Sequence, residues 1–250
     1  MIISHKYKFI FIKPNKVAGT SIEIALAKHC GESDIITPIT EYNPKSDSTH
    51  YNQPARNYEE DGYYHHITPA KIKSKLGDKW NEYYKFTVVR NPYDRIVSSY
   101  FWNKKRPTPA SKRRDLQSLL RKATTPKAYL SFFRKTKNKI LSAVFFSNLS
   151  EFEKFVKLFP ERRTNNIYYF DKKGQPICDY YMRYENLDDD YRAVCNHLGI
   201  PYTQLPKTKN KHRKDKKHYS VLYSAASKKK VESLYRRVID YFQYSFEKEK

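Results

Sequence analysis

A continuous apolar run near the start of the chain, followed at once by a turn and a helical segment, is the feature that most restricts the fold. In the stretch "FIFIKPNKVAGTSIEIALAKH", residues 9–12 are all apolar, as expected of a strand that is buried on both faces. From Thr20 to His29 the apolar side chains recur at helical spacing. A strand over 7–13, a tight turn and a helix therefore predict one unit of an α/β sheet.

The turn in this unit has the composition of an anion-binding loop. Gly19 allows the backbone to approach an anion closely. Thr20 and Ser21 offer N–H and hydroxyl donors at a helix N-terminus, where the helix dipole favours negative charge. Lys16 adds a full positive charge. The standard Gly-x-x-x-x-Gly-Lys-Ser/Thr loop is absent, however, and an ordinary strand–helix turn with a solvated lysine fits the same residues.

A second strand, over 85–90, ends in a basic residue. In "FTVVRNPYDRIVSSYFW" this residue is Arg90, where a metal-dependent nucleotide phosphotransferase usually has an acid. The guanidinium fork of arginine matches two phosphate oxygens. Ser98 lies eight residues further on, in a helix expected over 93–103, so its hydroxyl can reach the same anion. The alternative is that Arg90 is the structural partner of Asp94. We expect Arg95 to face solvent.

The rest of the chain continues the alternation of strands and helices. This pattern predicts an α/β fold with a mostly parallel central sheet flanked by helices. We expect one domain over 1–250, with polar or basic insertions around 35–64 and 104–139. The further elements expected are helices over 68–76 (Thr68 as N-cap, Pro69 first, Gly77 at the end), 151–159, 187–198 (ended by Gly199) and 224–246, and a strand over 179–185.

The composition restricts the partners and the location. A formal net charge of +23 indicates an anionic partner, such as a nucleic acid, a polyanionic glycan, a membrane face or a nucleotide. The three cysteines form no Cys-x-x-Cys pair, which favours free thiols in a reducing compartment over a zinc site. No segment approaches the ~18 consecutive apolar residues of a membrane span. The first residues are too soon interrupted for a secretion signal, so we expect a cytoplasmic location.

The ordered motifs resemble one known family. "PNKVAGTS" followed by "RNPYDRIVSSY" is similar to the paired signatures of sulfotransferases that use 3′-phosphoadenosine 5′-phosphosulfate (PAPS). The segments "HHITPAKIKSKLG", "MRYENLDDDYRAVCNHLGI" and "HYSVLYSAASKKKVESLYRRVIDYFQYSF" resemble the carbohydrate branch of that family. Two features depart from it: Asn15 stands between Pro14 and Lys16, and the membrane anchor usual in the animal relatives has no counterpart here.

The resemblance implies a P-loop-containing, sulfotransferase-like fold and a reaction. A sulfuryl group would pass from PAPS to a hydroxyl of a carbohydrate, leaving 3′-phosphoadenosine 5′-phosphate (PAP), with no metal required. The first loop would bind the 5′-phosphosulfate, and Arg90 with Ser98 would bind the 3′-phosphate. A late basic loop would close over the donor. The donor-binding residues so implied are Lys13, Lys16, Ala18, Gly19, Thr20, Ser21, Arg90, Ser98 and Arg213, with His212 as a further contributor.

The acceptor hydroxyl must lose a proton, which requires a base with a pKa near neutral. The family pattern favours His66, with His65 second, and Lys16 would stabilise the leaving oxygen. A histidine just before Thr68 also fits a surface or capping role. The carboxylates of Glu23 and Glu185 are the fallback bases, and we expect Glu185 to pair with Arg183 or Arg192.

Two other functions fit parts of the sequence. A basic nucleic-acid-binding protein on the same fold would explain the charge and the scattered aromatic residues. It would not explain the spacing of Arg90 and Ser98 or the loop at Lys16. A P-loop nucleotide kinase is disfavoured by the motif order and by the missing acid.

Overall fold

A five-stranded sheet forms the centre of the computed structural model, which describes residues 1–39, 55–105, 148–206 and 217–247. The strand order is β3-β1-β2-β4-β5. β1 is antiparallel to both of its neighbours, whereas β2, β4 and β5 pair in parallel. Four of the five strands therefore run in one direction, which confirms a mostly parallel sheet. The strands are β1 (Ile2–Ser4), β2 (Phe9–Phe11), β3 (Ile35–Ile36), β4 (Tyr84–Val89) and β5 (Tyr180–Arg183).

The first strand differs from the expectation. The strand expected over 7–13 is shorter, because β2 covers only Phe9–Phe11. The preceding residues Ile2–Ser4 form β1, and the two strands make a hairpin in which Ile3 lies opposite Ile10. Strands of two or three residues carry too little pattern for the sequence to reveal them, so β1 and β3 were not predicted.

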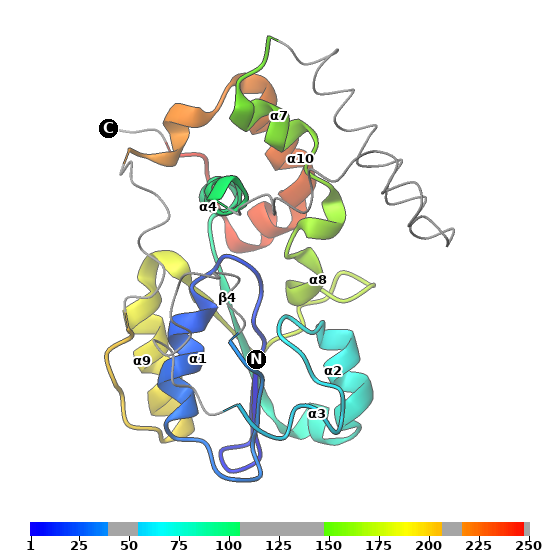
Figure 1. Cartoon of the computed structure of the whole chain (residues 1–250), viewed down its shortest axis with the longest axis vertical. Helices are drawn as coiled ribbons and strands as arrows, with labels where there is room; N and C mark the ends of the chain where they lie inside the picture. Colours follow the sequence, from blue (N-terminus) through cyan, green and yellow to red (C-terminus); the bar gives the residue numbers. More distant parts are fainter. Residues whose placement is uncertain (40–54, 106–147, 207–216, 248–250) are drawn as a thin grey trace, which may run out of the picture.

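Helices cover both faces of the sheet (Figure 1). On one face lie α1 (Gly19–Ala27) and α9 (Leu187–Leu198), which pack on Phe9 and Phe11. On the other face lie α2 (Pro69–Leu76) and α3 (Lys79–Glu82), which pack on Ile10 and Ile12. Neighbouring side chains of β2 thus enter opposite cores, as the two-residue period of a strand requires.

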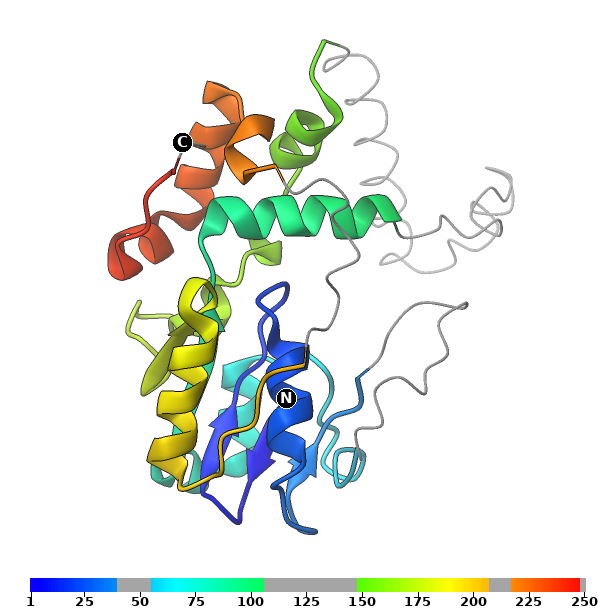
Figure 2. The same cartoon turned by 90° about the vertical axis from the view of Figure 1, so that its left-hand side faces the viewer.

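A second group of helices lies beyond the carboxyl end of the sheet. Figure 2 shows α4 (Pro92–Lys105) crossing that end, with α7 (Glu151–Lys157) and α10 (Ala225–Phe242) on its far side. The short α8 (Asn166–Tyr169) packs against α10. The short 3₁₀ segments are η3 (Glu161–Arg163), η4 (Tyr184–Asn186) and η6 (Tyr219–Leu222).

The expected helix ends are confirmed where a capping residue marks them. α2 follows its N-cap Thr68 with Pro69 and ends at Gly77, and α9 ends at Gly199, which adopts a left-handed conformation. The last helix is shorter than expected, because Gln243 is left-handed and α10 stops at Phe242. All three cysteines are free, as expected. Most of the two expected insertions, and the basic run at 207–216, lie outside the described residues.

Candidate functional site

The loop between β2 and α1 leads directly into the N-terminus of α1. Lys16 and Ala18 both have left-handed backbones, with φ of 65° and 63°. Ala18 is the N-cap of α1 and makes no side-chain capping bond, and the first turn of α1 contains no acid. Backbones that turn in this way gather N–H groups into anion-binding concavities. An anion bound here would lie against the positive end of the α1 dipole.

Gly19 is required by packing. A Cβ atom on Gly19 would lie 2.8 Å from Cγ of Lys13, closer than side-chain carbons approach in proteins. The Lys13 side chain is only 2% exposed and its ammonium pairs with Glu23, which is fully buried. Burial alone would raise the pKa of the Glu23 carboxyl, but the Met1 ammonium and Lys13 hold that pKa below its usual value. Lys13 and Glu23 therefore form a buried ion pair beneath the loop.

Arg90 joins the two motifs. Its Nε and Nη2 donate to Asp94 over 2.8 and 2.6 Å, so the ion pair considered from the sequence is present. Its Nη1 donates to the main-chain oxygen of Lys16 over 3.1 Å, and its guanidinium lies 3.8 Å above the ring of Tyr184. β2 and β4 are parallel neighbours, so the residues that follow them meet at one edge of the sheet.

One stripe of α4 faces this meeting point. Asp94, Ser98 and Trp102 are spaced four residues apart and so share a helix face. Asp94 at one end binds Arg90, and the Lys16 ammonium lies 4.3 Å from the centre of the Trp102 ring at the other end. Half-buried Ser98 lies between them on the same stripe. The structure therefore places Ser98 on the side of α4 that faces Arg90 and Lys16.

His66 lies beside the loop with a defined tautomer. Its Nδ1 lies 2.7 Å from the main-chain oxygen of Lys13. A carbonyl oxygen only accepts hydrogen bonds, so Nδ1 carries the proton and Nε2 carries the lone pair. Burial lowers the pKa of His66 to about 4, which keeps the imidazole neutral at pH 7. The His65 ring packs edge-on against it, with ring centres 3.9 Å apart.

Arg95 does not face solvent, and that expectation was wrong. It is 3% exposed and donates to the main-chain oxygens of Asn15 (3.4 Å) and Arg163 (2.9 Å) and to the side chains of Asn165 and Tyr235. Asn165, which sequence reasoning missed, also donates to the Asn15 oxygen, over 2.8 Å. The burial of Arg95 results from α8 and α10, which lie far along the chain, so no local pattern indicates it.

Glu185 also has partners other than those expected. Its carboxylate accepts from the main-chain N–H of Asn91 over 2.7 Å and from the Tyr244 hydroxyl over 3.0 Å. The expected partners bind elsewhere: Arg183 donates to the oxygen of Phe242, and Arg192 pairs with Asp188. Arg213 and His212 lie outside the described residues.

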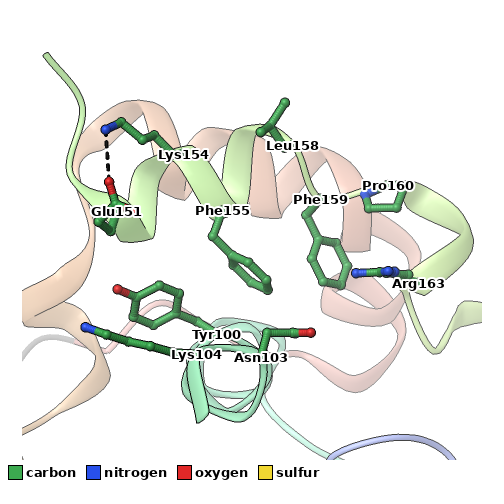
Figure 3. A pocket seen from close by; sticks show the side chains of 10 residues that line it. All are labelled: Tyr100, Asn103, Lys104, Glu151, Lys154, Phe155, Leu158, Phe159, Pro160 and Arg163. Carbon is green, nitrogen blue, oxygen red and sulfur yellow. Dashed lines mark hydrogen bonds and ion pairs between the residues drawn. The ribbon is translucent and has the colours of Figure 1, made fainter. Parts of the chain in front are cut away.

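A cleft of about 380 Å³ lies between α4 and α7 and is distinct from the loop (Figure 3). Its α4 wall consists of Tyr100, Asn103 and Lys104, which lie away from the stripe that carries Ser98. None of the described residues from 12 to 21 lines it. The cleft is therefore not part of the candidate site. The other lining residues are Glu151, Lys154, Phe155, Leu158, Phe159, Pro160 and Arg163.

The fold and the site define an α/β protein with a strand–loop–helix unit that carries Lys16 and a second cationic residue, Arg90, directly after a neighbouring parallel strand. A protein-family model described as the sulfotransferase family matches residues 1–245, and the chain belongs to this family. Membership indicates a transferase of sulfuryl groups. Searches of curated proteins and of solved structures each found no match. Within the described residues, no helix has the length and apolarity needed to cross a membrane.

Proposed function

We propose that the protein transfers a sulfuryl group from PAPS to a hydroxyl of a carbohydrate. The observation that carries this proposal is the 3.1 Å hydrogen bond from Arg90 to the Lys16 carbonyl, which joins two cationic motifs 74 residues apart. Two such groups at one edge of the sheet suit a ligand with two separate anionic groups. The carbohydrate acceptor rests on the likeness to the carbohydrate branch of the family.

The donor would match the loop through the positive charge of Lys16 and the N-terminal end of the α1 dipole. In this proposal the 5′-phosphosulfate occupies the N-terminus of α1, where Ala18, Gly19, Thr20 and Ser21 supply donors. Lys16 neutralises the charge that grows on the phosphate oxygen as its bond to sulfur breaks. We exclude Lys13 from these ligands, because its ammonium is already paired with Glu23.

The 3′-phosphate is assigned to Arg90 and Ser98. Asp94 aligns the guanidinium through two hydrogen bonds, and the Tyr184 ring covers one of its faces. Ser98 projects from the same helix stripe as Asp94, so its hydroxyl adds a second donor. Arg213 stays a proposed ligand from the family resemblance alone.

His66 is the proposed base, although burial lowers its pKa to about 4, below the near-neutral value expected from the sequence. Its Nε2 carries the lone pair, and the bond of Nδ1 to the Lys13 carbonyl fixes the ring next to the loop. The acceptor proton would move to Nε2 as the acceptor oxygen bonds to sulfur. Glu23 is less suited to the role, because it is fully buried and already bound to two cations.

A thermal melt with matched nucleotides tests the donor. PAP and ADP each carry two phosphates, but only PAP has one at the 3′ position, which Arg90 and Ser98 would bind. At 100 times its dissociation constant, PAP should stabilise the fold by about 2.7 kcal/mol, and ADP at the same concentration by much less. Equal shifts from the two nucleotides would count against the assignment. Binding of nucleic acid that weakens steeply with salt, without any PAP binding, would favour the nucleic-acid alternative.

A further inference from the structure

The main-chain oxygens of the loop are held by side chains from four distant positions. His66 binds the Lys13 oxygen and Arg90 binds the Lys16 oxygen. The Asn15 oxygen between them accepts two bonds, from Asn165 over 2.8 Å and from Arg95 over 3.4 Å.

These bonds determine where the loop N–H groups point. In a trans peptide the C=O and the following N–H point in opposite directions. The N–H of Lys16 therefore points away from Asn165 and Arg95, and the N–H of Val17 points away from Arg90. The N–H groups of Lys16 and Val17 therefore point to the side of the loop opposite the side chains that bind its oxygens.

We propose that Asn165 and Arg95 are positioning residues for the 5′-phosphosulfate, an inference that rests on the proposed function. By fixing the Asn15 carbonyl they fix the plane of the Asn15–Lys16 peptide, and so the N–H and the direction of Lys16. Neither side chain touches the ligand, because Asn165 is 1% exposed and Arg95 is 3% exposed, beneath the loop.

The backbone of Lys16 shows why such a support is needed. Its φ of 65° is unfavourable for a residue with a side chain, by roughly 1–2 kcal/mol. Rotation of the Asn15–Lys16 peptide plane changes that φ directly. Without a bond on the Asn15 carbonyl, the loop gains freedom to relax and to turn the Lys16 N–H away from the anion.

The chain offers an isosteric variant and a matched control. Asn165→Asp keeps an oxygen to accept from Arg95 but has no N–H for the Asn15 carbonyl. Asn165→Ala removes both interactions. The control is Asn166→Ala, because Asn166 also donates from Nδ2 to a main-chain oxygen, that of Leu234 over 3.1 Å, and does not contact the loop.

The experiment compares two ligands by calorimetry on the full chain. PAP carries both phosphates, whereas adenosine 3′-monophosphate lacks the 5′-phosphate. We expect Asn165→Asp and Asn165→Ala to weaken PAP binding about tenfold, which corresponds to ~1.4 kcal/mol. Binding of adenosine 3′-monophosphate should stay within about twofold of wild type, which also shows that the variants are folded. Asn166→Ala should leave both affinities unchanged.

The outcomes separate this inference from the proposed function. Unchanged PAP affinity in both Asn165 variants overturns the inference and leaves the proposed function in place. A parallel loss for both ligands shows a general structural role and also overturns it. If the wild-type protein binds no PAP, the proposed function itself fails.

Discussion

At the residue scale, the proposed base His66 also makes structural contacts. Its φ of 59° is left-handed, and its own main-chain oxygen accepts from the Tyr168 hydroxyl over 2.7 Å. Its Nδ1 holds the Lys13 carbonyl. A substitution that removes the whole side chain would therefore disturb the loop as well as the chemistry, so the test of the base needs a replacement that keeps the contact.

His66→Asn provides that test. The asparagine amide can donate to the Lys13 carbonyl in place of Nδ1, and asparagine tolerates a left-handed backbone better than most residues. We expect PAP affinity to be kept and sulfate transfer to fall by about 10²–10⁴-fold, because the proton acceptor is gone. The measurements are calorimetry for PAP and transfer from labelled PAPS to a panel of glycans.

His65→Ala is the comparison for this variant. If His65→Ala is inactive while His66→Asn turns over normally, the two histidines exchange roles. Full activity in both variants would remove histidine as the base and direct attention to Glu23.

The pKa of His66 also predicts a pH-dependent stability. Burial lowers this pKa from 6.5 to about 4, so between these values the folded state binds fewer protons than the unfolded state. Stability should therefore fall as pH falls through this window. Relative to His66→Asn, the wild-type protein should lose ~3 kcal/mol more between pH 7 and pH 4. Urea unfolding at several pH values measures this difference, and parallel curves for the two proteins would contradict the prediction.

At the element scale, the close approach of α1 to the Lys13 side chain depends on Gly19, which has no Cβ atom. Gly19→Ala would place a methyl group 2.8 Å from the buried Cγ of Lys13, so we expect a loss of about 1–3 kcal/mol in the free energy of unfolding. Gly31→Ala, beyond the other end of α1, meets its nearest atom at 3.6 Å and should change stability by less than about 0.5 kcal/mol. Urea unfolding of both variants measures these free energies. Equal stabilities of Gly19→Ala and Gly31→Ala would show that Lys13 moves aside at little cost.

A second prediction at this scale concerns Arg90, which pairs with Asp94 of α4. Arg90→Ala should weaken PAP binding by ~1.5–3 kcal/mol, because it removes a charge-assisted hydrogen bond. Arg236→Ala is the matched control, since Arg236 forms the same (i, i+4) pair with Asp240 on the exposed surface of α10. Calorimetry should show an unchanged PAP affinity for the control. Comparable losses in the two variants would mean that general charge, not Arg90, attracts the nucleotide.

At the scale of the whole molecule, the sequence predicts elements best where a local signal marks their ends. α2 and α9 begin and end at the expected residues, because Thr68, Pro69, Gly77 and Gly199 are local capping signals. β1 and β3 were missed because two or three residues show no period. The end of α10 depends on Gln243 adopting a left-handed conformation, which glycine signals more clearly than glutamine does.

The residues of the candidate site also fall into two groups, those whose positions the sequence predicts and those whose positions it does not. Lys16 and Arg90 follow strands, so their positions at the edge of the sheet were predictable from the pattern. Arg95 and Asn165 were not, because a helix position becomes buried only when another part of the chain packs on it. The contact of Trp102 with Lys16 likewise depends on the path of the loop, which the sequence leaves open.

The bonds on the loop carbonyls also have a consequence for the order of folding. The partners of the loop lie 53, 74, 80 and 150 residues further along the chain. Each contact closes a large segment, and the entropic cost must be met before the bond contributes. We therefore expect the loop to take its final shape late, after α8 has docked. A nascent chain in which Asn165 has not yet been synthesised would already contain Lys16 and Arg90. It would lack the hydrogen bond from Asn165 to the Asn15 oxygen that helps to shape the loop between β2 and α1.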